Sequence, residues 1–92
     1  MDDLLNLYIG KRIRLRRKAL GLSQAEVATR AGMQFRQIHK YECCENRTSA
    51  VVLYKLAGAL EVSVHYFFEG WRDSAAAAAS AQDARPVSAM LQ

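Results

Sequence analysis

Lysine and arginine side chains are concentrated in one part of the 92-residue sequence. Between residues 11 and 47, ten of them stand against only three acids (Glu26, Glu42 and Glu45), a local excess of seven positive charges. The rest of the chain has an excess of three negative charges, within a total of +4. A basic segment of this kind favours polyanions, because each neutralised phosphate releases condensed counterions. The alternative interpretation is a solvated cationic face that binds nothing.

The residues that most often hold metals or form nucleophiles are few. Cys43 and Cys44 are adjacent, and the two histidines are His39 and His65. This spacing does not match paired metal ligands such as C-x2-C, so we expect no metal and no cofactor. Neighbouring cysteines close a disulfide only through a strained ring, which predicts free thiols. The sequence also has no paired carboxylates, Ser/His/Asp set or glycine-rich phosphate loop, and we expect no catalytic residues and no enzyme.

The basic segment is predicted to be helical. An apolar stripe over residues 7–20 indicates a first helix, and Gly21 follows where a helix end favours a left-handed residue. Ser23 and Glu26 stand three apart before an apolar pair, which is a capping-box signature. This signature predicts a second helix that starts at Gln24 and ends at Gly32.

A third helix is expected after a connection of only two residues. Phe35, Ile38 and Tyr41 recur three apart, which indicates a helix through Glu42. Two short helices joined by a tight glycine turn are typical of a helix-turn-helix, whose second helix enters the major groove of DNA.

Two further helices are predicted towards the carboxyl end of the folded region. Ser49 is placed to cap a fourth helix, in which Leu53, Leu56, Ala57 and Leu60 form one apolar face. Ser63 is placed to cap a last short helix over residues 64–68, and we expect Val64 and Phe67 to be buried.

Several short motifs follow one another in a recognisable order over residues 7–70. They are Ile9-Gly10-x-Arg12-Ile13-Arg14, Gly21-Leu22-Ser23-Gln24, Val27-Ala28, Gly32, Ile38, Tyr41-Glu42 and Leu53-x-x-Leu56-Ala57-x-Ala59-Leu60-x-Val62-Ser63. In combination they resemble the phage-repressor-like, Cro/XRE-type helix-turn-helix family, and in particular its alphaproteobacterial branch. The resemblance implies an all-α, five-helix, lambda-repressor-like domain over residues 1–71. It further implies a sequence-specific transcriptional regulator that binds double-stranded DNA with an inverted-repeat operator as a homodimer.

The resemblance also implies roles for individual residues. Gln24, at the start of the second helix, is expected to contact a DNA phosphate. Residues 34–42 form the recognition helix, in which Arg36 and Lys40 are expected to read base edges. The other expected contacts are Gln34, Phe35, Gln37, His39, Asn46 and Arg47. For Phe35 a place in the core is the alternative, and Met33, Val27, Ala28 and Ile38 are expected to be core.

Two features near the carboxyl end of the third helix also follow from the resemblance. An ion pair between Arg17 and Glu42 is expected to be structural. Family members commonly carry glycine where Cys44 stands, because the chain turns there with a positive φ, so the turn is either strained or different. Because the nearby cations would lower a thiol pKa, a redox-sensing role for Cys43 and Cys44 remains an alternative.

The composition changes after Trp71, where residues 72–92 include five consecutive alanines. We expect this segment to be a disordered tail or a helix completed by a protein partner. The alternative function is therefore an antitoxin-like interaction module with an autoregulatory helix-turn-helix. The expected dimer surface comprises Tyr66, Phe68 and Trp71.

No apolar run approaches the roughly 18–20 residues that cross a bilayer. The first residues, Met-Asp-Asp, also lack the features of a secretory signal. The sequence therefore predicts a cytoplasmic protein without a membrane partner.

Overall fold

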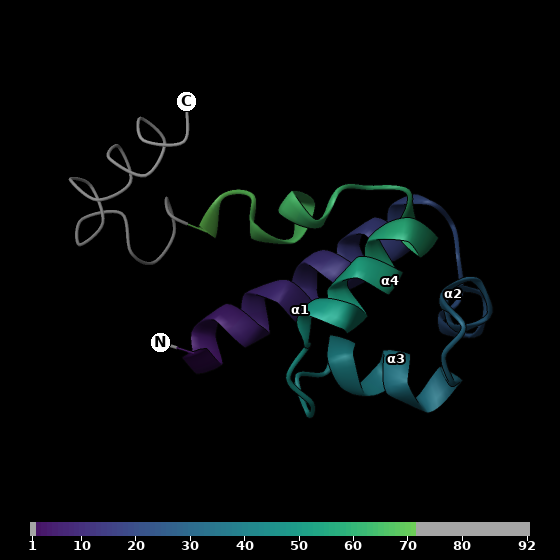
Figure 1. Ribbon diagram of the computed structural model, residues 1–92, viewed down its shortest axis with the longest axis horizontal. Helices are drawn as coiled ribbons and strands as arrows, with labels where there is room; N and C mark the ends of the chain where they lie inside the picture. The colour runs from purple at the N-terminus through teal and green to yellow at the C-terminus, as the bar shows by residue number, and fades with distance from the viewer. Residues whose placement is uncertain (1, 72–92) are drawn as a thin grey trace.

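The computed structural model describes residues 2–71, which form an all-helical unit (Figure 1). The bounds are α1 Asp2–Ala19, α2 Gln24–Ala31, α3 Phe35–Glu42, α4 Ala50–Leu60 and a short 3-10 helix, η1, Val64–Phe68. The all-helical prediction is confirmed, with the difference that the fifth element is a 3-10 helix. The predicted tail lies outside the described residues. None of the helices described combines the length and hydropathy that crossing a membrane requires.

The first helix is longer than predicted, because it begins at Asp2 and not at Leu7. Its inward face is formed by Leu5, Ile9 and Ile13, which are spaced four apart and pack in or against the core. Leu7, which was expected on the apolar stripe, is 41% exposed instead. Ile9 and Ile13 of the predicted stripe are buried, so only Leu7 was placed on the wrong face of the helix. The helix ends as predicted, with Gly21 at a φ of 72°.

Local sequence sets both ends of α2. The Ser23 hydroxyl accepts a hydrogen bond from the Glu26 amide at 3.0 Å, and the Ser23 amide donates to Glu26 Oε1 at 2.8 Å. The hydrogen bond that the Ser23 amide donates, and after it one from the Ser23 side chain, hold the pKa of the Glu26 carboxyl below its ordinary value. The carboxylate therefore stabilises the fold above the ordinary glutamate pKa and stops doing so as the pH falls through the lowered one. Gly32 ends the helix with a φ of 69°.

The core lies where α1 and α4 run beside each other and α2 and α3 pack at one end of the pair (Figure 1). The buried hydrophobic residues are Ile9, Ile13, Val27, Ala28, Ala31, Ile38, Tyr41, Leu53, Leu56, Ala57, Ala59, Leu60 and Phe67. All four predicted apolar positions of α4 are among them, and Met33 packs against this cluster while only partly buried. The angle between α2 and α3 is thus set by apolar side chains from both helices.

Two predictions for the last helical segment are wrong. The Ser63 side chain makes no capping hydrogen bond. Val64 is 36% exposed, because Phe67 occupies the buried position over α1 and α4 and leaves Val64 at the rim of a surface depression beside Tyr54.

The aromatic residues around η1 pack mainly against α1. The Arg12 guanidinium carbon lies 3.9 Å from the centroid of the Tyr66 ring, and the Tyr8 and Trp71 rings are 5.5 Å apart between centroids. Tyr66, Phe68 and Trp71 are half-buried as a result. These three residues therefore expose less aromatic surface for the predicted dimer contact than the sequence indicated.

A close approach of α1 to the end of α3 depends on Gly10. A Cβ atom at this position would lie 2.8 Å from the Tyr41 carbonyl oxygen and 2.9 Å from Cys44 Sγ. Gly10→Ala is expected to lower the free energy of unfolding by about 1–2 kcal/mol net, because overpacking outweighs the better helix propensity of alanine. Urea unfolding of the purified chain measures this difference.

Gly58 provides a matched control in α4, since a Cβ atom there would meet nothing within 4 Å. Gly58→Ala is expected to raise stability by about 0.5–1 kcal/mol through helix propensity alone. Equal stability of the two alanine variants would contradict the close approach of α1 and α3.

Candidate nucleic-acid interface

The third helix, α3, is held from one side and exposed on the other. Ile38 and Tyr41 are buried, which attaches the helix to the core. At its start the Gln34 amide donates to Gln37 Oε1 at 3.0 Å. The residues of this segment with exposed side chains are Gln34, Phe35, Arg36, Gln37, His39 and Lys40. Phe35 is 53% exposed, so its alternative place in the core is wrong.

The exposed face of α3 borders a surface depression of about 300 Å³. Its lining comprises Phe35, Arg36, His39, Lys40 and Glu45. Two cations, an imidazole and an aromatic ring therefore share one concave surface with a single carboxylate. Such a set offers hydrogen-bond donors and an apolar plane to the same ligand.

A buried carboxylate ties this helix to the two that precede it. Glu42 Oε2 lies 2.6 Å from Arg17 Nε, and Glu42 Oε1 lies 3.0 Å from Arg17 Nη2. The side chains of Arg17 and Glu42 are only 12% and 3% exposed. Glu42 Oε1 also accepts from Gln24 Nε2 at 3.0 Å, a contact that the sequence did not predict. One carboxylate thus joins α1, α2 and α3.

This pairing affects the titration of Arg17. The hydrogen bonds that Arg17 donates to Glu42 raise the pKa of the Arg17 guanidinium, against the smaller opposing effect of burial. Arg17 Nη1 also donates to the Leu22 carbonyl at 2.9 Å, so three guanidinium hydrogens are used inside the protein. Arg17 is therefore a structural cation and not a free phosphate ligand.

Beside this network lies a second depression of about 330 Å³. Its lining comprises Arg14, Arg17, Gln24, His39, Glu42 and Cys43. Arg14 is exposed, and it places a cation from α1 next to the start of α2 and the end of α3. The sequence analysis missed Arg14, although its position three residues before Arg17 puts both on one helix face.

The turn after α3 is built on a left-handed residue, because Cys44 has a φ of 65°. Its thiol lies 3.7 Å from the Asn6 carbonyl oxygen and is partly buried. Burial raises the pKa of the Cys44 thiol, and Cys43 raises it further, while Lys11 acts in the opposite direction. The expectation that nearby cations lower the thiol pKa is therefore wrong for Cys44. Its side chain packs against α1.

Asn46 and Arg47 follow this turn, and both are exposed. Arg47 Nη2 lies 3.2 Å from Asp3 Oδ1, with side chains that are 67% and 93% exposed. Exposed pairs of this kind contribute little to stability, typically about 0–1 kcal/mol. The Asp3 contact therefore does not prevent Arg47 from binding another anion.

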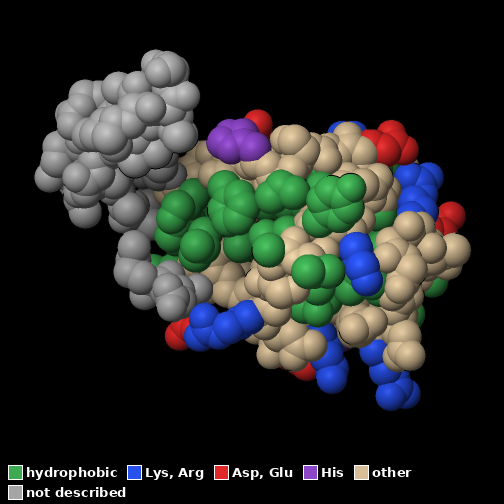
Figure 2. Space-filling view, viewed as in Figure 1, with side chains coloured by type: hydrophobic (Ala, Val, Ile, Leu, Met, Phe, Trp, Pro, Cys, Tyr) green, Lys and Arg blue, Asp and Glu red, His purple; other side chains and the backbone are tan. Residues whose placement is uncertain are grey.

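Positive and hydrophobic side chains occupy different parts of the face shown in Figure 2. Figure 2 shows hydrophobic side chains in a band over η1 and α4, while lysine and arginine side chains lie mainly along the lower and right-hand edges of this face. The exposed hydrophobic side chains of α4 are Val51 and Tyr54. The exposed face of α3 is thus part of the cationic side of the described residues.

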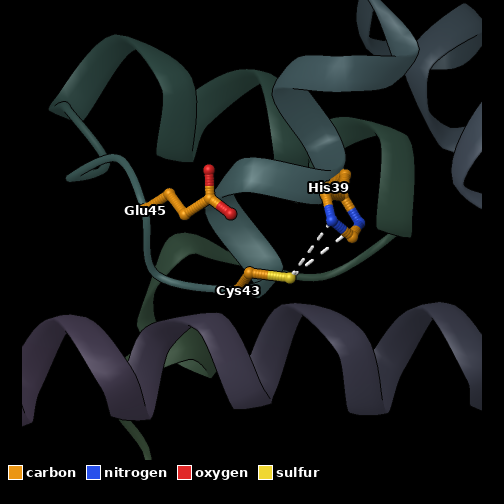
Figure 3. Close-up of side chains that lie close together, drawn as sticks. All are labelled: His39, Cys43 and Glu45. Atoms are coloured by element: carbon orange, nitrogen blue, oxygen red, sulfur yellow. Dashed lines mark hydrogen bonds between the residues drawn. The ribbon is translucent and has the colours of Figure 1, made fainter.

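Three side chains with metal-binding atoms also meet at the end of α3 (Figure 3). The ligand atoms of His39, Cys43 and Glu45 all lie within 4.8 Å of one another. His39 and Cys43 are one helical turn apart, and the turn at Cys44 brings Glu45 back towards them. The sequence analysis found no such grouping, because it depends on this turn and not on a familiar spacing of cysteines.

Comparison with known proteins settles the family of this fold. The helix-turn-helix family HTH_3 matches residues 13–67. The chain belongs to this family. The predicted Cro/XRE-type resemblance is thereby confirmed, and the match covers α2, α3 and α4 in full.

Curated relatives of this family member come from alphaproteobacteria, as the sequence indicated. An uncharacterised transcriptional regulator in the ATPase CF(0) region of Rhodospirillum rubrum is 48% identical over 64 residues, which are 70% of this chain and 59% of that protein. An HTH-type transcriptional regulator of Sinorhizobium fredii is 42% identical over 71 residues, or 77% of this chain and 50% of that protein. The chain thus spans little more than half the length of these relatives.

Solved helix-turn-helix proteins have the same fold. The restriction-modification controller protein C.AhdI from Aeromonas hydrophila superposes with a TM-score of 0.67 at 32% identity, covering 68% of this chain and 96% of that chain. The P22 c2 repressor, solved in complex with a synthetic operator, has a TM-score of 0.62 at 34% identity and covers 67% of this chain and 94% of that chain.

Proposed function

We propose that this chain is the DNA-binding part of a transcriptional regulator and that α3 enters the major groove of double-stranded DNA. The observation that carries the proposal is that α3 is buried on one side and exposed on the other. Ile38 and Tyr41 hold it on the core, while the side chains that can reach base edges remain exposed. Family membership and relatives named as transcriptional regulators support the same function. No enzymatic activity is part of the proposal.

Arg36 and Lys40 are the proposed base readers. The guanidinium of Arg36 has forked donors that match O6 and N7 of guanine, and Lys40 addresses a guanine or a phosphate. Exposed Phe35 is placed to contact thymine methyl groups. The proposed flanking contacts are Gln34, Gln37 and His39.

Phosphate contacts are proposed on both sides of α3. Gln24 lies at the amino end of α2, where backbone amides favour an anion, and one of its amide hydrogens is held by Glu42. The second amide hydrogen is proposed to bind phosphate. Arg14 supports this contact from α1, while Asn46 and Arg47 are proposed to contact the backbone beyond the turn. These contacts set position but do not read sequence.

The proposed target is an inverted repeat bound by two copies of the chain. The operator complex of the P22 c2 repressor supports DNA as the ligand of this fold. Two copies of α3 in successive major grooves require half-sites about 34 Å apart, which is one turn of DNA. We propose residues 1–71 as the DNA-binding unit and residues 72–92 as a separate segment. A cytoplasmic location follows from this function.

Selection of bound sequences from random duplex DNA tests the proposal directly. We expect recovery of an inverted repeat, and affinity for it should fall steeply as salt rises, because phosphate binding releases counterions. Gln24→Ala is expected to weaken binding to all duplexes alike, since its contact carries no sequence information. Binding without sequence enrichment and without salt dependence would contradict the proposed function.

A further inference from the structure

The geometry points to a zinc-binding site formed by His39, Cys43 and Glu45 at the end of α3. An imidazole nitrogen, a thiolate sulfur and a carboxylate oxygen are the three protein donors that Zn²⁺ takes most often. All three residues are exposed, so a metal ion from solution reaches them without opening the fold. Three protein ligands leave the fourth tetrahedral position to water.

The distance between the first two donors already fits a shared zinc ion. Cys43 Sγ lies 3.5 Å from His39 Nε2. Zinc bonds of about 2.3 Å to sulfur and about 2.0–2.1 Å to nitrogen, at a tetrahedral angle, place these donors roughly 3.5 Å apart. Figure 3 shows the sulfur directed at the imidazole ring and the carboxylate of Glu45 on the neighbouring loop. The last turn of α3 and the residue that follows it therefore hold two ligands at the required separation.

The third ligand needs only a small movement. A Glu45 oxygen lies within 4.8 Å of both other donors, and a tetrahedral site requires about 3.5 Å. The loop position of Glu45 is set by its amide, which donates to the Lys40 carbonyl at 2.9 Å. Rotation of the exposed Glu45 side chain closes the remaining distance while the backbone stays in place.

Zinc binding has a defined proton balance. The ion displaces the proton of the Cys43 thiol, forms bonds to sulfur, His39 nitrogen and a Glu45 oxygen, and releases one proton to solution. The site therefore gains one positive charge overall, since two enter with zinc and one leaves with the proton. This gain offsets the carboxylate of Glu45 beside Lys40 and Arg36, which line the same depression.

A consequence for DNA rests on the proposed function. His39 and Glu45 border the face that is proposed to meet DNA, so the added charge is expected to strengthen duplex binding in the presence of zinc. If the chain does not bind DNA, the zinc proposal still stands, because the metal site is tested without DNA.

Cobalt titration of the untagged, reduced chain tests the site, since Co²⁺ reports a bound thiolate by a charge-transfer absorption band. We expect this band with the native chain, its loss on addition of Zn²⁺, and release of one proton per zinc in calorimetry with two buffers. Cys43→Ser is expected to abolish the band. His39→Ala and Glu45→Ala are expected to weaken cobalt affinity at least tenfold, and circular dichroism verifies that each variant is folded.

Cys44→Gly is the matched control, because it removes the other thiol and places glycine at the left-handed position. It is expected to keep the band. The proposal is overturned if the native chain shows no thiolate band, if Cys43→Ser keeps the band while Cys44→Gly loses it, or if Glu45→Ala binds cobalt as tightly as the native chain.

Discussion

Glu42→Ala is expected to lower the free energy of unfolding by about 3–5 kcal/mol, which is the usual cost of leaving a buried charge without its partner. The substitution removes both hydrogen bonds from Arg17 and the one from Gln24. Arg17, whose side chain is 12% exposed, then retains only the Leu22 carbonyl as a described partner. Urea or thermal unfolding followed by circular dichroism measures the loss.

Asp3→Ala is the control for this prediction, because it breaks another arginine–carboxylate pair whose side chains are exposed. It is expected to change stability by no more than about 1 kcal/mol. A small domain has little stability to lose, so Glu42→Ala alone could leave the chain unfolded. The loss of stability in Glu42→Gln is expected to lie between those of Glu42→Ala and Asp3→Ala, because its amide oxygen still accepts hydrogen bonds. If the Glu42→Ala and Asp3→Ala variants have the same free energy of unfolding, the buried pair of Arg17 and Glu42 does not hold the helices together.

Arg36→Ala is expected to weaken binding to the selected operator by about 1–3 kcal/mol, or roughly 5- to 150-fold, and to relax preference at one base position. The reason is loss of the forked donors that contact two acceptors of one guanine. Arg36 is exposed on α3, so the substitution should leave the fold unchanged. Binding curves for the operator and for single-base variants of it provide the measurement.

Two variants separate base reading from charge. Arg36→Lys keeps the charge but not the forked geometry, and it should lose base preference while keeping most non-specific affinity. Lys55→Ala removes an exposed cation from α4, on another helix, and should affect operator binding much less. If Arg36→Ala leaves affinity and preference intact, α3 is not the recognition helix in the proposed sense.

The parts of the fold that could be predicted from sequence are those set by neighbouring residues. Ser23 and Glu26 contact each other within a single helical turn, so their spacing alone predicts the start of α2. Gly32 likewise ends the same helix through its own left-handed backbone. Interactions of this range need no knowledge of the rest of the chain.

Predictions that depended on which face meets the core were less secure. Leu7 and Leu5 are two residues apart, and only packing against the other helices decides that Leu5 turns inward. The prediction that Val64 is buried was wrong for a related reason, since Phe67 takes the buried position over α1 and α4. Phe35 could not be assigned for the same reason, until the packing of α3 placed it outside.

The sequence by itself determined the order of the helical segments, the caps of α2 and α4 and the concentration of positive charge, because these depend on residue type and short-range spacing. Tertiary structure alone decided which groups meet across the fold. It joined Gln24 to Glu42, brought Arg14 beside the start of α2, and buried the Cys44 thiol against α1. It also decided that Glu45 lies beside His39 and Cys43. Such contacts arise from the packing of helices and the path of the turn at Cys44, which no local pattern specifies.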